Sequence, residues 1–122
     1  KITYRKSISG NDSFDVAIIG AGFSGLWSAY HLKQFQPELK IAIFEAEYVG
    51  FGASGRNGGW ASAEYPTSSQ RVIRENGIES YRDLRSAITS AIDEIGLIAK
   101  QHNWQIDYAK VAHFSLQEIW LN

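Results

Sequence analysis

Two apolar runs near the start of the chain predict neighbouring strands. Residues 14–19 (Phe-Asp-Val-Ala-Ile-Ile) and 40–44 (Lys-Ile-Ala-Ile-Phe) are nearly continuous apolar stretches that contain β-branched residues. This pattern is typical of strands buried on both faces of a parallel sheet. Between them, residues 23–35 predict a helix, which Pro37 cannot continue. The order strand, helix, strand predicts a βαβ unit and therefore an α/β fold class.

The second part of the chain predicts mainly helices. Residues 47–60 hold five glycines without apolar periodicity, which predicts a long and functional loop. A short helix is expected at 68–76, ending before Gly77, and a strand-like pattern covers 105–116. The clearest helix is 78–102, because apolar residues recur there at spacings of three and four. Its predicted packing stripe consists of Ile78, Tyr81, Leu84, Ile88, Ala91, Ile92, Ile95, Ile98 and Ala99.

Composition narrows the possible functions. The chain has 122 residues, of which 44% are hydrophobic and 20% charged, so we expect one small globular domain at most. A net charge of −1 gives no broad field for nucleic acid or an anionic membrane. Cysteine is absent, which excludes disulfides and thiolate metal sites and fits a reducing compartment; we therefore expect a cytoplasmic protein.

The ends of the chain favour an incomplete protein. Residues 1–13 are polar and predict an irregular arm without a signal peptide, and no stretch is apolar enough to predict a membrane span. The chain starts with Lys1 and contains no methionine, so we expect residues before Lys1 to have been removed or left out.

The turn between the first strand and the helix has the pattern of a phosphate cradle. Residues 20–25 (Gly-Ala-Gly-Phe-Ser-Gly) match G-x-G-x-x-G. Gly20 would make the tight turn, Gly22 would let a pyrophosphate approach the backbone, and Gly25 would let the helix pack closely on the strand. The amino end of the helix adds N–H groups and a positive dipole end.

An acidic residue completes this first motif. Glu45 ends the second predicted strand, 45 − 25 = 20 residues after Gly25, which is close to the ~20 expected for a ribose-binding acid. Its carboxylate would accept hydrogen bonds from both hydroxyls of an adenosine ribose and would repel a 2′-phosphate. The motif therefore predicts an adenine dinucleotide, with FAD and NAD both open and NADP disfavoured.

A second glycine-rich stretch, residues 50–60, follows directly. In an open α/β sheet, ligands bind beyond the carboxyl ends of the strands, which is where this loop is expected. Ser54 and Asn57 can donate hydrogen bonds to phosphate oxygens or a ring edge, and Arg56 supplies a fixed positive charge. This chemistry suits an extended, polar, anionic ligand.

The motif at 20–25, Glu45 and the run 52–59 together resemble the N-terminal region of the D-amino-acid-oxidase-like FAD-dependent oxidoreductases. Residues 54–59 (Ser-Gly-Arg-Asn-Gly-Gly) are especially similar to the gamma-glutamylputrescine oxidase branch. The resemblance implies FAD as cofactor and a Rossmann-like FAD/NAD(P)-binding βαβ unit with additional helices, as an incomplete N-terminal fragment of a larger two-domain flavoprotein. The cofactor-binding residues expected on this basis are Gly20, Gly22, Phe23, Ser24, Gly25, Glu45, Ala46, Ser54, Gly55, Arg56, Asn57, Gly58 and Gly59.

The resemblance also implies a reaction and an organisation. The reaction would be oxidation of a C–N bond in a small amine or amino acid, with hydride transfer to the flavin. Residues 14–104 would form the N-terminal part of the FAD-binding domain, and 105–122 would begin a substrate-domain sheet. We expect the remainder of the same polypeptide, or another chain, to complete the fold, and we expect the fragment alone to be inactive.

Two other functions stay open: an NAD-linked dehydrogenase with the same βαβ opening, and a dinucleotide-binding fragment without chemistry. The loop at 52–59 argues against the first, because an NAD domain normally continues into another βαβ crossover. His31, His102 and His113 have no spacing for a metal site or a triad, and no residue is assigned a catalytic role. Trp60 is a candidate to flank the flavin ring, although a structural role is equally open.

Overall fold

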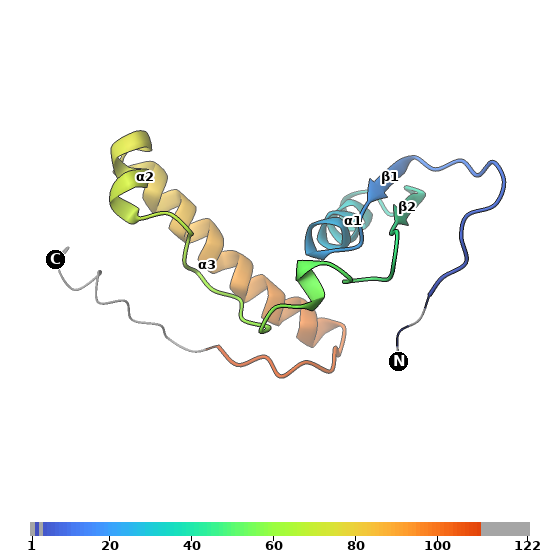
Figure 1. Ribbon diagram of the computed structural model, residues 1–122. Helices are drawn as coiled ribbons and strands as arrows, with labels where there is room; N and C mark the ends of the chain where they lie inside the picture. Colours follow the sequence, from blue (N-terminus) through green and yellow to red (C-terminus); the bar gives the residue numbers. More distant parts are fainter. Residues whose placement is uncertain (1, 3, 111–122) are drawn as a thin grey trace. The chain divides into compact units, whose positions relative to one another are not determined.

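A computed structural model describes residue 2 and residues 4–110. The chain divides into two compact units, Lys1–Trp60 and Ala61–Asn122 (Figure 1), each of which is considered by itself. Residues 4–13 form no helix or strand. None of the helices among the described residues is long and apolar enough to cross a membrane.

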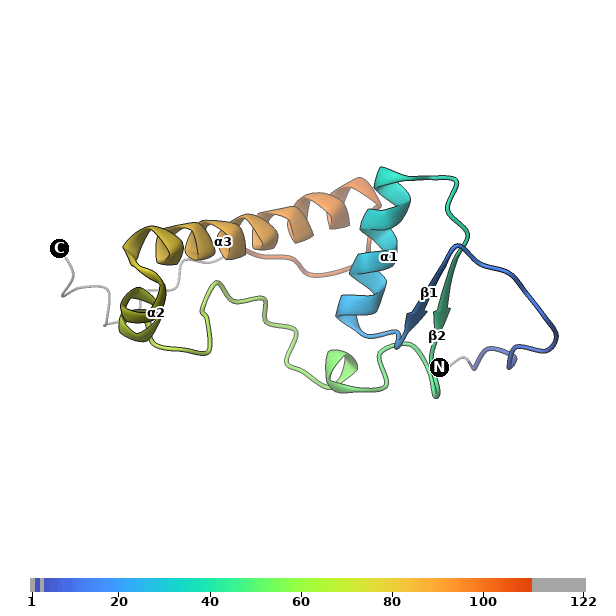
Figure 2. The same ribbon diagram turned by 90° about the horizontal axis from the view of Figure 1, so that it is seen from above.

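The first unit is built on two parallel strands, β1 (Val16–Ile19) and β2 (Ile41–Phe44). Val16 pairs with Ile41 and Ile19 with Phe44, so both strands end at the same edge (Figure 2). The side chain of Asp15 accepts a hydrogen bond from the amide of Lys40 at 2.7 Å, where the two strands begin. The βαβ prediction is confirmed, and each strand begins one or two residues later than its apolar run.

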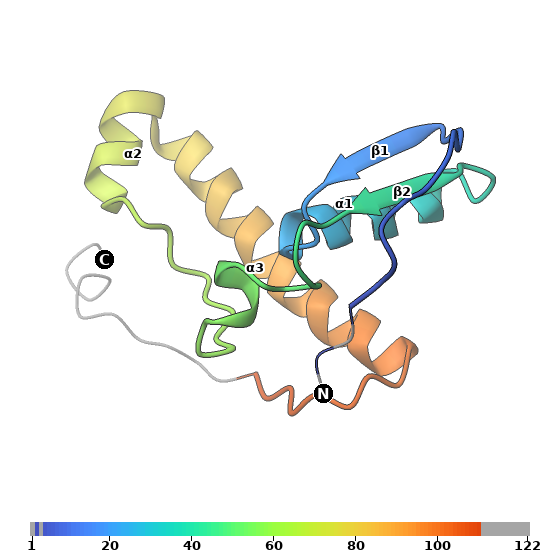
Figure 3. The same cartoon turned by 45° about the vertical axis from the view of Figure 1, so that its right-hand side comes forward.

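Helix α1 (Phe23–Phe35) links the two strands and lies against one face of the pair (Figure 3). Its bounds are those predicted. It ends at Phe35, because Gln36 leaves helical geometry before Pro37. The prediction that the strands are buried on both faces is wrong for the described unit: Ile19 is 84% exposed. On the same strand Ala17 is also exposed, whereas Phe44 of β2 is half-buried and its ring meets that of Phe14 edge-on.

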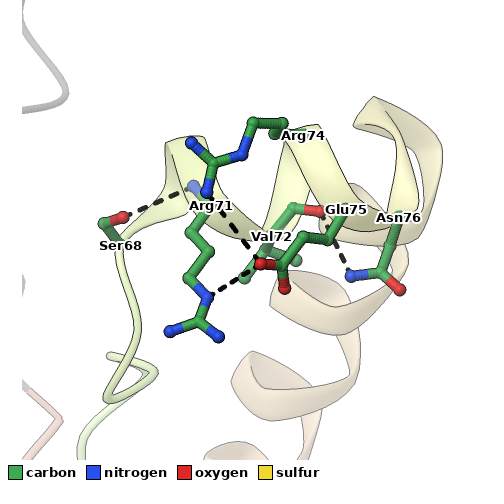
Figure 4. A network of polar contacts seen from close by, with 6 residues as sticks. All are labelled: Ser68, Arg71, Val72, Arg74, Glu75 and Asn76. Carbon is green, nitrogen blue, oxygen red and sulfur yellow. Dashed lines mark hydrogen bonds and ion pairs between the residues drawn. The ribbon is translucent and has the colours of Figure 1, made fainter.

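The second unit is a helical hairpin of α2 (Ser69–Asn76) and α3 (Ile78–Gln101). Gly77 joins them with a φ of 86°, a conformation that costs glycine little. The hydroxyl of Ser68 caps α2 by accepting a hydrogen bond from the amide of Arg71, and the side chain of Arg71 forms an ion pair with Glu75 (Figure 4).

The apolar stripe predicted for α3 is largely confirmed. Ile98 and Ala99 are buried, whereas Leu97, which lies outside the stripe, is 68% exposed. Two stripe members are exposed, namely Ile78 and Ala91. The periodicity therefore identified the packing face of the helix. The least buried residues of that face lie at the start and in the middle of the helix.

The segment after α3 folds back along the helix. The hydroxyl of Tyr108 donates a hydrogen bond to the carbonyl of Ile92 at 2.9 Å, and the ring lies against Gly96. Residues 105–110 form no strand. The remainder of the predicted strand, 111–116, lies outside the described residues, so the domain boundary at residue 105 stays a prediction.

Candidate functional site

The glycine-rich turn joins β1 to α1 in a tight bend. Gly20 has a φ of 96°, and its amide donates to the carbonyl of Phe44 at 2.7 Å, which extends the strand pairing. A Cβ atom at Gly25 would lie 2.1 Å from the carbonyl oxygen of Gly20 and 3.3 Å from a methyl group of Ile18. Gly20 and Gly25 therefore have the structural roles predicted from the motif: one makes the turn, and the other lets the helix approach the strand.

Three backbone amides of the glycine-rich turn indicate an anion-binding site. The amides of Ala21 and Phe23 already donate to side chains of this unit. Among the described residues, by contrast, the amides of Gly22, Ser24 and Gly25 have no hydrogen-bond partner. They lie at the amino end of a 13-residue helix, where unpaired N–H groups and the helix dipole both attract negative charge. The turn therefore fits a diphosphate.

The carboxylate of Glu45 lies at the mouth of the same turn. Because β1 and β2 end at the same edge, one carboxylate oxygen reaches the amide of Ala21 at 2.9 Å, and the other accepts from the amide of Glu47 at 3.1 Å. The hydrogen bond from Ala21, then that from Glu47, lowers the pKa of Glu45 from 4.5, so the group is charged at neutral pH. Each oxygen can accept further hydrogen bonds, as binding to a ribose requires.

The second glycine-rich loop is anchored to the first turn at two points. The amide of Gly50 donates to the carbonyl of Ala21 at 3.0 Å, and the hydroxyl of Ser54 accepts from the amide of Phe23 at 2.9 Å. Ser54 lies within a short 3-10 helix, Ala53–Gly55. The structure therefore brings both predicted motifs together in one unit.

Ser54 gives Gly22 a role that sequence reasoning missed. A Cβ atom at Gly22 would lie 2.9 Å from the Ser54 hydroxyl oxygen, so a side chain there would push away the residue that caps α1. The signal for such a distant cap was present: position 22, the N-cap of α1, is a glycine and has no side chain to cap the helix. The first N–H groups of such a helix are open to a hydrogen-bond-accepting side chain from elsewhere in the chain, to water or to a ligand.

The rest of the second loop is held by its own polar side chains. Asn57 donates to the carbonyl of Ser54 at 2.6 Å and accepts from the amide of Gly59 at 2.7 Å. Its side chain was expected to donate to a ligand, whereas in this structure it fixes the loop. A Cβ atom at Gly55 would lie 2.2 Å from the carbonyl oxygen of Gly50, so this glycine lets the loop close on itself.

Arg56 also makes its contacts within the loop. Its Nε atom donates to the carbonyl of Phe51 at 2.9 Å, and its guanidinium carbon lies 4.7 Å from the centre of the Phe51 ring. The direct contacts described above join Glu45 and Ser54 to the glycine turn, whereas the described contacts of Arg56 are with Phe51 of its own loop. Sequence reasoning did not identify Phe51, because an isolated aromatic residue between two glycines carries no motif signal.

The two histidines among the described residues lie in different units. His31 stacks on Trp27 within α1, and His102 stacks on Trp104 in the second unit. His113 lies outside the described residues. In the described part of the chain, no group of three or more His, Asp or Glu side chains is arranged to hold a metal ion.

Comparison with known proteins gives a family match over most of the chain. The family model described as DAO, FAD dependent oxidoreductase, matches residues 15–118. No solved structure matches this chain.

Individual relatives cover the same region. The chain is 33% identical over 94 residues to gamma-glutamylputrescine oxidoreductase of Escherichia coli (strain K12), which is 77% of this chain and 22% of that protein. It is 34% identical over 96 residues to the probable oxidoreductase OrdL of Haemophilus influenzae, with 79% and 22% covered. It is 42% identical over 82 residues to coproporphyrinogen III oxidase of Staphylococcus aureus, with 67% and 16% covered. The chain thus spans about a fifth of the length of these relatives.

Proposed function

Because this chain belongs to the DAO family of FAD-dependent oxidoreductases, we propose that it holds the ADP half of FAD in an enzyme that oxidises a C–N bond of an amine or amino acid. One observation carries the proposal: the amides of Gly22, Ser24 and Gly25, which have no hydrogen-bond partner in the part of the chain that the structure describes, lie in the turn that the carboxylate of Glu45 contacts. A site with N–H donors for phosphate and an acceptor for sugar hydroxyls matches both parts of an adenosine diphosphate.

The residues of the chain would divide the work of binding. The three amides would hold the diphosphate, Glu45 would accept from the ribose, and Arg56 would add positive charge from the second loop. Ser54 would contribute by fixing that loop to the amino end of α1. The remaining residues expected along the cofactor are Gly20, Phe23, Ala46, Gly55, Asn57, Gly58 and Gly59. When bound, FAD supplies the hydride acceptor for the oxidation.

The substrate class rests on similarity. The name of the E. coli relative, gamma-glutamylputrescine oxidoreductase, points to an amine substrate for that protein. Other relatives are named coproporphyrinogen III oxidase and thiamine thiazole synthase, so the family accommodates different chemistry on related cofactor domains. The proposal of C–N oxidation follows the similarity to gamma-glutamylputrescine oxidoreductase and the resemblance of residues 54–59 (Ser-Gly-Arg-Asn-Gly-Gly) to that branch of the family.

The native polypeptide would complete the fold. Helix α1 carries Trp27, His31 and Phe35 on one side, and Phe35 is 82% exposed. Uncovered apolar surface of this kind is unfavourable in water and needs further protein against it. Since the chain spans about a fifth of its relatives' length, we propose that the remainder of the same polypeptide covers this helix, and that 105–122 begins the substrate-domain sheet. A cytoplasmic location, expected from the sequence, stays a prediction.

The cofactor is tested first, in the native polypeptide that carries this chain. We expect visible flavin absorbance after purification, and FAD as the molecule released on denaturation. Replacement of Glu45 by glutamine should weaken FAD binding roughly tenfold or more, since a charged acceptor is lost. Glu47→Gln is the matched control, because Glu47 contributes its backbone amide and not its side chain to this cluster.

A colourless protein that binds NADH would instead favour an NAD-linked dehydrogenase. A colourless protein that binds neither FAD nor NADH would indicate a fragment without chemistry.

The reaction is tested separately. Anaerobic addition of small amines or amino acids should bleach the flavin absorbance, because the C–N bond is oxidised as the flavin is reduced. If FAD is present and only porphyrinogens or other substrates without an amine at the reacting carbon bleach it, the C–N assignment is wrong while the cofactor assignment stands.

A further inference from the structure

Arg56 is held by one neighbour through two different contacts. Its Nε atom donates to the Phe51 carbonyl at 2.9 Å, and the guanidinium carbon lies 4.7 Å from the centre of the Phe51 ring. The first contact fixes the direction of the side chain, and the second is a cation–π interaction. Together they restrict a side chain that otherwise has large rotamer freedom.

Phe51 is itself fixed by the surrounding loop. Its ring meets the ring of Tyr48 edge-on at a centroid distance of 5.2 Å, and its amide donates to the Tyr48 carbonyl at 2.9 Å. The ring of Tyr48 in turn meets that of Tyr4 at 5.9 Å. Gly50, between Tyr48 and Phe51, donates its amide to the carbonyl of Ala21 in the glycine turn. The support of Arg56 is therefore joined to the backbone of the proposed phosphate cradle.

This arrangement leaves the outer end of Arg56 available. Among the described residues, the two Nη atoms have no hydrogen-bond partner, while Nε and one face of the guanidinium are occupied by Phe51. Four N–H donors in a planar fork suit the oxygens of a phosphate, and pre-ordering the fork lowers the entropy lost on binding.

We infer that Phe51 is a positioning residue that orders Arg56 for the diphosphate of the dinucleotide. This inference rests on the proposed function, since it takes FAD as the ligand of the second loop. Phe51 acts through Arg56 and has no assigned contact with the ligand of its own.

The test is a double-mutant cycle in the native polypeptide, with the dissociation constants of FAD and of ADP as readouts. Phe51→Leu keeps an apolar side chain and removes the aromatic face, so both ligands should bind about two- to fivefold more weakly, as for an exposed cation–π contact. Phe51→Tyr keeps the ring and should restore binding. In an Arg56→Gln background, Phe51→Leu should have no further effect, because the residue that it positions is already absent.

Salt dependence separates positioning from general loosening of the loop. Both Arg56→Gln and Phe51→Leu should flatten the increase of the ADP dissociation constant with ionic strength, because the first removes the charge and the second leaves the same charge less ordered near the diphosphate. Equal losses from Phe51→Leu with and without Arg56, an unchanged salt dependence, or weakening of FAD without weakening of ADP would each overturn the inference. If the unmodified protein binds neither ligand, the proposed function fails first; if it binds both and Phe51→Leu binds them equally well, only the role of Phe51 is wrong.

Discussion

Each unit contains a glycine inside a helix at a place where a side chain does not fit, and the two differ in what occupies that place. At Gly25 in α1, an added Cβ atom would lie 2.1 Å from the backbone carbonyl oxygen of Gly20. At Gly96 in α3, it would lie 2.5 Å from the ring of Tyr108. A side chain can rotate away, but the backbone of a strand end cannot move without opening the turn. Gly25 is therefore required by the backbone path of the turn. Gly96 is only favoured by its contact with the Tyr108 side chain, which can move.

The polar contacts of the two units also differ in how far they involve the backbone. In the first unit, the strand ends and both loops are joined largely by hydrogen bonds to the backbone, such as those from Ala21 to Glu45 and from Phe23 to Ser54. The second unit also has ion pairs between exposed side chains of the same helix, such as Arg71 with Glu75 in α2 (Figure 4) and Arg82 with Glu79 in α3. Exposed ion pairs of this type contribute little to stability. Fixed backbone donors belong to the unit that we propose binds an anion.

The largest effect is expected from Gly25→Ala. The new methyl group collides with the backbone of Gly20, so the change should cost at least the ~1–3 kcal/mol typical of overpacking and should abolish tight FAD binding. Hydrogen exchange, measured by mass spectrometry, should increase most in residues 16–45. Gly52→Ala is the control, since Gly52 has a φ of −73° and nothing within 4 Å of the added atom. Unchanged exchange in Gly25→Ala would remove the contrast between the two glycines.

The next largest effect compares two serine caps. Ser54 caps α1 from 31 positions away at 2.9 Å, whereas Ser68 caps α2 locally at 3.4 Å. Ser54→Ala should cost about 1 kcal/mol and weaken FAD binding, because it also detaches the second loop from α1. Ser68→Ala should cost less and leave FAD affinity unchanged. Urea unfolding and FAD titration measure both quantities; equal changes in FAD affinity would contradict the distinction.

A smaller effect is expected from Gly96→Ala. The new methyl group displaces the Tyr108 ring and breaks its hydrogen bond to the Ile92 carbonyl. Alanine is the better helix former by about 1 kcal/mol, so the net change in stability should stay below about 1 kcal/mol. Tyr108→Phe is the companion variant, which removes only the hydroxyl group. In Gly96→Ala, the amides of residues 104–110 should exchange faster; a loss of stability as large as that of Gly25→Ala would show that Tyr108 cannot move.

The smallest effects should appear at opposite ends of the pH scale. The pKa of Glu45 is lowered, mainly by the Ala21 amide, so its contribution is present above about its usual 4.5 and is lost as pH falls through the lowered value. The pKa of Lys110 is raised by its hydrogen bond to Asp93, so its contribution is present below about 10.5 and is lost as pH rises through the raised value. Glu45→Gln should flatten the acid side of a Tm–pH profile, and Asp93→Asn the alkaline side. Interchanged or absent effects would contradict these pairings.

The secondary structure was largely predictable because its signals are local. Helix α1 has the predicted bounds, and α2 and α3 differ from prediction by one residue at one end. The spacing of Glu45 from Gly25 placed the acid beside the turn, because the carboxyl ends of parallel strands lie at one edge. Burial was less predictable: continuous apolar runs indicate what a strand is suited to pack against, and part of that packing is lacking in the described unit.

The sequence by itself determined the βαβ unit, the glycine turn and the acid at its mouth, because strand and helix periods, turn glycines and fixed spacings act over short stretches of chain. Only the tertiary structure decided which N–H groups remain for a ligand. The Ser54 hydroxyl takes the amide of Phe23 from 31 positions away, and Phe51 takes one face of Arg56. Such pairings depend on where the folded loop lies relative to the edge of the sheet, and no local sequence pattern encodes that position.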